Sequence, residues 1–323
     1  MNVQCELCPK RCDVAPGESG ECRIRVNLDG KLLAVTYGYP CSVHVDPVEK
    51  KPVFHFLPGT STFSLATVGC NLHCLNCQNW EISQQNPEDV PASPLPPEDV
   101  VRLAQKHGCR SVSYTYTDPV VYYEYTLDCC RRVREGGLKN VLVTAGYINA
   151  EPWRELLREV DAARIDLKSM SDAFYRDVCG ATLNPVLAAL TTARSMVPLV
   201  EVIHLVIPTL NDRDEDLTQL CRWIKENLGP DAPLHFSRFF PQYRMHNLPP
   251  TPLSTLERAK QIAETEGLRY IYMGNISERE SANTYCPSCR NLLIRRSGYR
   301  VLENHLREGR CPKCRSEIYG IWK

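Results

Sequence analysis

Residues 63–77 read FSLATVGCNLHCLNC. The apolar run FSLATVG predicts a buried strand. Cys70, Cys74 and Cys77 follow it with the spacing C-x3-C-x2-C, so three thiols share one short loop at the carboxyl end of that strand. A structural zinc site or an electron-transfer 4Fe-4S cluster takes four protein ligands, and three cysteines therefore leave one metal position open to another ligand. The alternatives are a zinc site completed by His73 or a distant residue, and three unrelated core thiols.

Further β-rich runs follow this strand and alternate with helical patterns. The runs are SVSYTY (111–116), NVLVTA (140–145), ARIDL (163–167), LVEVIHLVI (199–207), LHFSRF (234–239) and RYIYM (269–273). Between the last two, Ser254 and Glu257 have the spacing of a helix capping box. Strands separated by single helices imply βα units and a parallel sheet. Six or seven such units predict an α/β fold with a partial barrel of the (βα)6 type, rather than a closed eight-stranded barrel.

Charge and hydropathy argue against a nucleic-acid-coating protein and against a membrane protein. The chain has 323 residues, with 38 Lys and Arg against 38 Asp and Glu, so its formal net charge is zero. A neutral chain does not coat nucleic acid or an anionic membrane through its overall field. No apolar run reaches the roughly 18 residues of a membrane span, and the opening residues MNVQCELCPKRC lack the apolar region of a signal peptide. We therefore expect a cytoplasmic protein with no membrane contact.

The chain contains 17 cysteines, and their clustering points to metal. In a reducing compartment, grouped cysteines bind metal or carry out redox chemistry more often than they form disulfides. Six are scattered and are expected to act as small buried apolar residues. The other eleven form three groups: Cys5, Cys8, Cys12 and Cys22; Cys70, Cys74 and Cys77; and Cys286, Cys289, Cys311 and Cys314.

The outer groups divide the chain into three expected parts. These are a Cys-rich N-terminal extension (1–62), the partial barrel (63–279) and a zinc-ribbon-like C-terminal module (280–323). The C-terminal group is a pair of C-x2-C knuckles, a spacing that favours zinc, whose binding energy would fold a segment with little core of its own. The N-terminal group, C-x2-C-x3-C-x9-C, suits zinc or an auxiliary iron–sulfur cluster, because four thiolates serve both metals.

Polar residues at the ends of the strands are candidate ligand contacts, since βα barrels bind ligands at the carboxyl ends of their strands. The second strand ends in Thr117-Asp118-Pro119. Asp118 is the candidate contact there. The alternative is that Asp118 caps the following helix, and both roles are compatible.

The fourth strand carries Asp166 and Lys168. Side chains alternate along a strand, so these two share one face while Ile165 and Leu167 share the other. If the apolar pair packs on the helices, the charged pair lines the barrel interior. Burying two charges there is costly unless they are paired or hold a ligand. A structural ion pair is the alternative to a ligand site.

The fifth and sixth strands are less specific. Val206 and Ile207 end the fifth, and His235, Ser237 and Arg238 cluster at the sixth. Alternation separates His235 and Ser237 from Arg238, so only one set faces the interior. His235 and Arg238 are candidate substrate contacts, although a structural role is the commoner one for such residues.

The three-cysteine loop after the first strand resembles the radical S-adenosylmethionine (SAM) superfamily. The resemblance implies that Cys70, Cys74 and Cys77 hold a 4Fe-4S cluster whose fourth iron is chelated by the amino and carboxylate groups of SAM. Electron transfer from the reduced cluster then cleaves SAM to a 5′-deoxyadenosyl radical, which abstracts hydrogen from a substrate. Asn76 departs from the pattern, because an aromatic residue commonly stands before the third cysteine.

The resemblance also implies roles for the strand ends. Thr117 and Asp118 are similar to the segment that holds the SAM amino group, with Asp118 in place of a glutamate. The Asp166-Leu167-Lys168 segment resembles that of glycyl-radical activases, in which the lysine meets the SAM carboxylate. Val206 and Ile207 resemble the segment that contacts adenine. The expected cofactors are thus a 4Fe-4S cluster, SAM and zinc.

Segments along essentially the whole chain resemble the radical SAM enzyme of the AmmeMemoRadiSam system. That family is similar to pyruvate formate-lyase-activating enzymes and occurs beside Memo-like and Ammecr-like proteins. These two proteins, together with an electron donor of the flavodoxin or ferredoxin type, are the expected partners. The segments are DPVEKKP (46–52), CQNWEISQ (77–84), YTY (114–116), HFSRF (235–239) and YMGN (272–275).

The C-terminal module is basic. Between Cys286 and Arg315 it has eight Lys and Arg residues against two Glu residues, a balance of +6. Such a patch suits RNA or an acidic protein, and a solvated basic face is the plain alternative. The cations are Arg290, Arg295, Arg296, Arg300, Arg307, Arg310, Lys313 and Arg315.

Three functions remain open at this point. The first is a radical SAM enzyme acting on a substrate of its own, and the second is an activase that installs a glycyl radical on a partner enzyme. The third is a non-catalytic, zinc-stabilised binding protein. No motif identifies the substrate.

Overall fold

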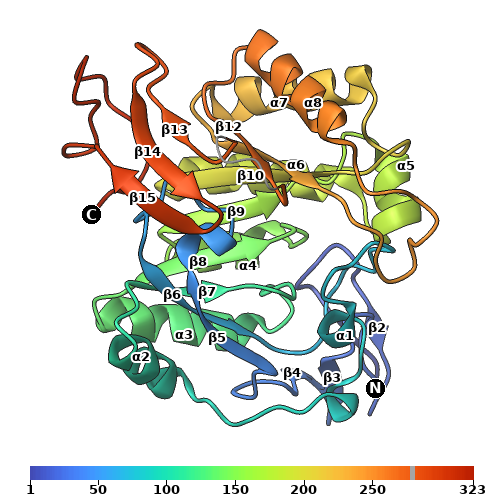
Figure 1. Cartoon of the computed structure of the whole chain (residues 1–323). Coiled ribbons are helices and arrows are strands. Elements are labelled where there is room, and N and C mark those ends of the chain that lie inside the picture. The colour runs from blue at the N-terminus through green and yellow to red at the C-terminus, as the bar shows by residue number, and fades with distance from the viewer. Residues whose placement is uncertain (277–280) are drawn as a thin grey trace.

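The computed structural model describes residues 1–276 and 281–323, which contain one sheet of eight strands in the order β12-β11-β10-β9-β8-β7-β6-β5 (Figure 1). Strands β6 to β12 run parallel, and β5 pairs antiparallel with β6. The sheet does not close, because β5 and β12 lie at its two ends. This confirms the predicted α/β fold with a partial barrel. The strands are β5 (Ser42–Pro47), β6 (Ser61–Ala66), β7 (Ser111–Tyr114), β8 (Lys139–Thr144), β9 (Ala162–Asp166), β10 (Leu199–Val206), β11 (Leu234–Arg238) and β12 (Ile271–Gly274).

A helix follows each strand from β6 to β11. These helices are α2 (Pro97–Lys106), α3 (Tyr123–Glu135), α4 (Ala150–Leu157), α6 (Leu183–Met196), α7 (Asp214–Leu228) and α8 (Leu253–Thr265). Helix α7 shows the local reasons clearly: three acidic residues occupy its first turn, and Gly229 ends it with a positive φ of 93°. The predicted capping box at Ser254 is wrong. Helix α8 begins at Leu253 after the extended Pro252, so Ser254 already lies inside the first turn and makes no cap bond.

The two faces of the sheet pack against different parts of the chain. On β8, Leu142 lies in the large core shared with the helices, whereas Val141 and Val143 belong to a second core on the opposite face. Residues from η1 (Val48–Lys50) to Leu57 and the C-terminal Ile321 fill this second core. Leu57 N–H donates to Ile321 O and Ile321 N–H donates to His55 O, both at 2.7 Å. Two segments far apart in sequence thus cover the face of the sheet that the helices leave open.

The N-terminal residues form two small hairpins near α1 (Trp80–Ser83) at one end of the molecule (Figure 1). Strand β1 (Val3–Gln4) pairs with β2 (Asp13–Val14), and β3 (Arg25–Leu28) pairs with β4 (Lys31–Ala34). Asp29 and Gly30 join β3 to β4 with φ values of 52° and 79°, as a two-residue type I′ turn requires.

The C-terminal strands form an antiparallel sheet beside β12, at the opposite end of the molecule (Figure 1). They are β13 (Thr284–Tyr285), β14 (Leu292–Ser297) and β15 (Arg300–Asn304). This sheet packs through Leu293 and Ile294 on Phe54 and on Tyr272 of β12. The short elements η2 (Pro87–Asp89), α5 (Asp172–Phe174) and the π-helical turn η3 (Tyr175–Cys179) complete the fold. Within the described ranges, no helix has both the length and the apolar character of a membrane span.

Candidate active site

A pocket of about 420 Å³ opens where the parallel strands end. It lies on the sheet face opposite the helices and is lined by strands β8 to β12 and by the segments that follow β6 and β7. Cys70, Cys74 and Cys77 line it together with Asp118 and Lys168. Residues about 100 positions apart along the chain therefore meet at one mouth, as ligand sites of parallel βα sheets do.

The three-cysteine loop is held from several sides. His73 N–H donates to Cys179 O (2.8 Å), and Leu75 N–H donates to Val178 O (2.9 Å), which ties the loop to η3. Asn71 Nδ2 donates to Tyr147 O (2.7 Å). These bonds place the loop before any ligand binds.

The thiols of the loop differ in environment. Cys74 is buried, whereas Cys70 and Cys77 are partly exposed. Burial raises the pKa of Cys70 and Cys77. A hydrogen bond from the buried Cys179 lowers the pKa of Cys74 and raises that of Cys179. Among the described residues Cys179 is absent from the pocket lining, so it lies behind Cys74. Cys179 is one of the six scattered cysteines that the sequence predicts to be small buried apolar residues.

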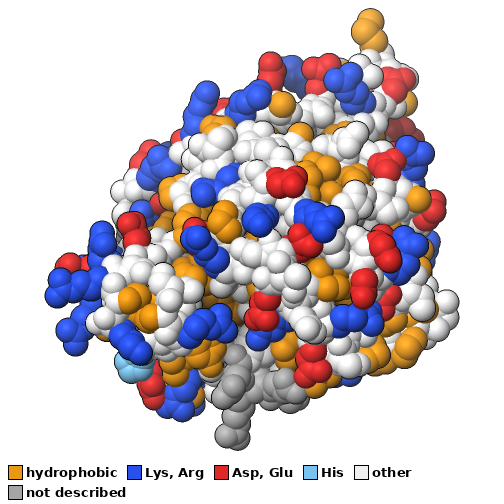
Figure 2. Space-filling view, turned by 90° about the horizontal axis from the view of Figure 1, so that it is seen from above, with side chains coloured by type: hydrophobic (Ala, Val, Ile, Leu, Met, Phe, Trp, Pro, Cys, Tyr) orange, Lys and Arg blue, Asp and Glu red, His pale blue; other side chains and the backbone are white. Residues whose placement is uncertain are grey.

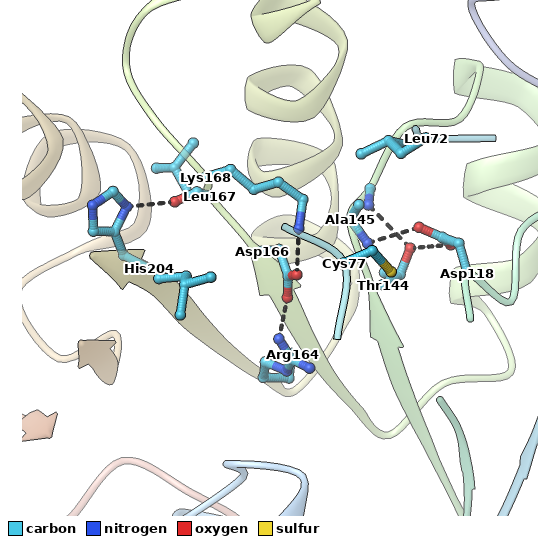
Figure 3. Close-up of polar contacts among 12 residues, drawn as sticks. Leu72, Cys77, Asp118, Thr144, Ala145, Arg164, Asp166, Leu167, Lys168 and His204 are labelled. Atoms are coloured by element: carbon cyan, nitrogen blue, oxygen red, sulfur yellow. Dashed lines mark hydrogen bonds and ion pairs between the residues drawn. The ribbon is translucent and has the colours of Figure 1, made fainter. Parts of the chain in front are cut away.

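Asp118 follows β7 and lies buried in the pocket wall (Figure 3). Its carboxylate accepts hydrogen bonds from Thr144 Oγ1 (2.7 Å) and from Ala145 N–H (2.9 Å), both at the end of β8. Burial raises the pKa of Asp118, and these bonds offset the effect only in part. The alternative of a helix cap is wrong, because α3 begins at Tyr123, with Tyr122 as its N-cap. Asp118 instead links the ends of two neighbouring strands.

Asp166 and Lys168 line the pocket with Arg164 (Figure 3), while Ile165 and Leu167 lie in the core shared with the helices. Lys168 Nζ lies 2.8 Å from Asp166 Oδ2, and Arg164 pairs with the other oxygen of Asp166. Burial raises the pKa of Asp166, but the two cations outweigh it, so its net pKa is lowered. Burial lowers the pKa of Lys168, but Asp166 and the neighbouring thiols raise it well above its usual value.

The charges of this group sum to +1 at neutral pH, since two cations share one carboxylate. The sequence analysis missed Arg164, although the same alternation that selects Asp166 and Lys168 also places Arg164 on their face. The backbone beside the group is held by His204, whose Nδ1 lies 2.8 Å from Leu167 O, and by Asn211 Nδ2, which donates to Lys168 O (2.8 Å). The group is therefore a fixed, net cationic surface.

Some of the remaining strand-end candidates line the pocket and others do not. Thr117 and His235 line the pocket; Thr117 Oγ1 donates to Thr67 O (2.8 Å). Val206 and Ile207 are buried outside the described pocket lining. The lining residues of β10 are Ile203 and Leu205, which have the opposite alternation. His235 Nε2 lies 2.6 Å from the buried Glu201.

Arg238, the last of these candidates, turns away from the pocket. Its Nε donates to Thr251 O (2.7 Å). Ser237, which alternates with it, lines the pocket beside His235. Of the two sets expected at the sixth strand, the one with His235 and Ser237 thus faces the interior.

Several pocket residues had no role assigned from the sequence. Lys51 Nζ lies 2.6 Å from Asp46 Oδ2 and 4.1 Å from the centre of the Tyr116 ring, and it lines the pocket with Tyr116. Burial lowers the pKa of Lys51 to about 8, although Asp46 raises it. Tyr299, between β14 and β15, also reaches the lining. Lys51 and Asp46 are close in sequence, but the contact with Tyr116 and the approach of Tyr299 bring distant segments together, so no local pattern predicts them.

The C-terminal cysteines converge on one point. All four Sγ atoms of Cys286, Cys289, Cys311 and Cys314 lie within 4.8 Å of one another. The Cys286–Cys314 and Cys289–Cys311 sulfur distances are 3.5 and 3.7 Å. The predicted pair of knuckles thus forms a four-cysteine site.

The N-terminal cysteines line a second, separate pocket. Cys5, Cys8, Cys12 and Cys22 share it with Asn71 of the three-cysteine loop. The two metal-type groups at this end of the molecule are therefore direct neighbours.

The predicted basic patch of the C-terminal module contains fewer free, exposed cations than the eight counted in the sequence. Arg296 is buried and donates to Phe54 O (2.7 Å) and Thr284 Oγ1 (2.8 Å). Arg295 pairs with Glu303. The other cations of the module are exposed, and Figure 2 shows Lys and Arg side chains gathered at this end of the molecule.

Comparison with known proteins agrees with this geometry. Residues 64–221 match the radical SAM superfamily. An uncharacterized protein of Methanocaldococcus jannaschii is 45% identical over 318 residues, or 98% of this chain and 95% of that protein. The pyruvate formate-lyase-activating enzyme of Clostridium pasteurianum is 22% identical over 166 residues, or 49% of this chain and 66% of that enzyme. A solved radical SAM methyltransferase from Sphaerobacter thermophilus shares the fold, with a TM-score of 0.52 at 15% identity over 73% of this chain and 71% of that one.

Proposed function

This chain belongs to the radical SAM superfamily and is related to its activating enzymes, and we propose that it uses a 4Fe-4S cluster at Cys70, Cys74 and Cys77 to cleave SAM reductively. One observation carries the proposal. The three thiols of the loop share a pocket with Asp118 and with the cationic group around Lys168. The proposed metal ligands thus lie beside a carboxylate and an ammonium group, which can bind the amino and carboxylate groups of the amino acid part of SAM.

The donor set fits such a cluster. Three thiols on one loop leave one iron for an exogenous ligand, and Cys179 stays behind Cys74, outside the described pocket lining. When bound and reduced, the cluster would supply the electron that converts SAM to the 5′-deoxyadenosyl radical for hydrogen abstraction. The protein contributes binding, orientation and exclusion of water.

The pocket residues would hold the amino acid part of SAM. Asp118 offers a carboxylate for the amino group, although Thr144 and Ala145 already direct its two oxygens. Lys168 offers an ammonium group for the SAM carboxylate, and Asp166 keeps that ammonium group charged and in place. Adenine contacts from β10 would fall to Leu205, which lines the pocket, rather than to Val206 or Ile207.

A zinc ion at the C-terminal four-cysteine site is part of the proposal. Zinc bound tetrahedrally to thiolates at about 2.3 Å sets the sulfurs about 3.8 Å apart. The Cys286–Cys314 and Cys289–Cys311 sulfur distances of 3.5 and 3.7 Å are close to that value. Zinc would hold the described part of the small C-terminal module, residues 281–323, on Phe54 and β12, where its own apolar core is limited.

An activase that generates a glycyl radical is the second candidate. Its support is the similarity to pyruvate formate-lyase-activating enzyme. Tyr299 at the pocket lining and the exposed cations of the C-terminal module offer a docking surface for an acidic protein partner or an RNA. The resemblance to the AmmeMemoRadiSam system names Memo-like and Ammecr-like proteins as partners to test, with a flavodoxin or ferredoxin as electron donor.

The test is anaerobic reconstitution with iron and sulfide, followed by reduction and addition of SAM. We expect SAM to change the electron paramagnetic resonance (EPR) spectrum of the reduced cluster and 5′-deoxyadenosine to form. The triple variant Cys70→Ala, Cys74→Ala, Cys77→Ala should show neither effect, while Cys41→Ala, outside all three groups, should show both. If the EPR spectrum of the iron-loaded native chain does not change when SAM is added, the proposal is refuted. Addition of candidate partner proteins and a search for a glycyl radical signal then separates the activase from an enzyme with its own substrate.

A further inference from the structure

The N-terminal pocket brings four thiols together in a segment with almost no other structure. Strands β1 and β2 have two residues each, yet Cys5 and Cys22 are buried and Cys8 and Cys12 are partly buried. All four line one pocket. A short segment without a core of its own commonly depends on a metal to hold such an arrangement.

A hydrogen-bond donor points at one of the four sulfurs. Glu21 N–H lies 3.5 Å from Cys12 Sγ. A donor directed at sulfur stabilises the thiolate rather than the thiol. This contact suits a metal-bound thiolate at Cys12.

One buried cationic donor of the pocket lacks a partner in the described part of the chain. Lys10, Glu21 and Arg25 line the pocket, and Lys10 pairs with Glu21 at 2.6 Å. Arg25 uses Nη1 and Nη2 to bind Glu124 at 2.7 and 2.8 Å, and among the described residues its buried Nε has no partner. Arg25 is only 9% exposed, so that unpaired donor is costly unless a group in the pocket accepts from it. A cluster carrying sulfides and four thiolates offers such an acceptor.

The spacing of the sulfurs distinguishes a cluster from a single zinc ion. Within residues 1–276 and 281–323, the C-terminal cysteines are the only group of three or more possible ligands whose atoms all lie within 4.8 Å. No three of the N-terminal thiols meet this spacing, and the three thiols of the Cys70 loop, where the proposed function places a cluster, do not meet it either. Wider spacing is expected for a cluster, because each thiolate binds a different iron instead of one shared ion.

We propose that Cys5, Cys8, Cys12 and Cys22 bind a second iron–sulfur cluster, of the four-iron type, rather than zinc. This cluster would lie directly beside the three-cysteine loop. A Cβ placed on Gly69 would lie 2.5 Å from Cys22 O, and Asn71 of the three-cysteine loop lines the N-terminal pocket. His73 Nε2 lies 3.3 Å from Glu21, which adds a third contact across the boundary.

Metal analysis of the whole chain tests this site. The native protein is reconstituted anaerobically with iron and sulfide, with zinc supplied, and iron, sulfide and zinc are counted per chain. We expect about eight iron atoms in the native chain and about four in the variant Cys70→Ala, Cys74→Ala, Cys77→Ala. The four that remain should give a 4Fe-4S EPR signal that SAM does not alter. Zinc should stay at about one per chain throughout.

The complementary variant is Cys8→Ala, Cys12→Ala, which changes the two partly exposed thiols. It should lose about half of the iron and keep the signal that responds to SAM, while Cys41→Ala should keep all the iron. Two results would overturn the proposal. One is a loop variant (Cys70→Ala, Cys74→Ala, Cys77→Ala) that contains no iron. The other is a native chain with a second zinc ion that the Cys8→Ala, Cys12→Ala variant lacks. The loop variant leaves the N-terminal segment intact and decides the matter even if the other variant fails to fold. Loss of the SAM-responsive signal alone would count against the proposed function and leave the second cluster standing.

Discussion

Replacing Gly69 by alanine should destabilise the junction between β6 and the three-cysteine loop. Gly69 has a φ of 96°, which disfavours any residue with a side chain. A Cβ at this position would lie 2.5 Å from Cys22 O and 2.7 Å from Ile24 Cγ2. Both neighbours belong to the packed N-terminal segment, and the nearest is backbone, so relief requires movement of the chain itself.

The magnitude follows from separating the two costs. Gly229 has nearly the same φ, 93°, but nothing lies within 4 Å of a Cβ built there. Gly229 has a ψ of 159°, a region essentially restricted to glycine, so Gly229→Ala should cost only the backbone strain, about 1–3 kcal/mol. Gly69→Ala should cost about 1–3 kcal/mol more, the usual penalty for overpacking.

Thermal unfolding of the two variants and the native chain, all loaded with metal in the same way, measures the difference. The extra cost should lower the unfolding midpoint of Gly69→Ala by about 2–9 °C relative to Gly229→Ala. Equal midpoints for the two variants would refute the inference that the N-terminal segment packs tightly on the loop. A drop confined to Gly229→Ala would refute it as well.

Four further outcomes are expected. Lys168→Met should raise the Kd for SAM about 10- to 100-fold in equilibrium binding, because a charged hydrogen bond is lost; an unchanged Kd would exclude contact with the SAM carboxylate. Lys51→Met should lower the free energy of unfolding by about 3 kcal/mol in urea, since it breaks a buried ion pair. Lys50→Met, which removes a half-exposed partner of the same carboxylate, should cost less than about 1 kcal/mol, and equal losses would contradict this. Burial raises the pKa of Asp46, but the hydrogen bonds from Lys50 and Lys51 outweigh burial, so the net pKa lies below the ordinary value of 3.8. The contribution of Asp46 to the free energy of unfolding is therefore complete above pH 3.8 and is lost as the pH falls below that value. The urea midpoint should thus drop as the pH falls from about 4 to about 2, and by less in Asp46→Asn; an equal drop would assign the effect to other groups. Cys286→Ala should release zinc and speed hydrogen exchange in residues 284–322 but not in β6 to β10; retained zinc would refute the four-cysteine site.

Local patterns in the sequence account for much of the candidate site. The alternation of short apolar runs with helices predicts the parallel sheet, because period and spacing are local properties that survive folding. The same alternation places Asp166 and Lys168 on the pocket face and would also have selected Arg164. The cysteine spacings mark three metal-type groups before any contact is known. Where the local reasoning failed, as with the cap at Ser254 and the helix expected directly after Asp118, the surrounding chain shifted the start of the helix.

The sequence alone therefore determined the order of the strands along the chain, the three-thiol loop and the paired knuckles, since each depends on residues within about 30 positions of one another. Tertiary structure alone decided that Lys51 meets Tyr116 in the pocket wall, and that Ile321 pairs with the segment around Leu57. It also decided that Arg296 is buried rather than part of a basic surface. These contacts join segments that no periodicity relates, so they exist only once burial and hydrogen bonding have brought distant parts of the chain together.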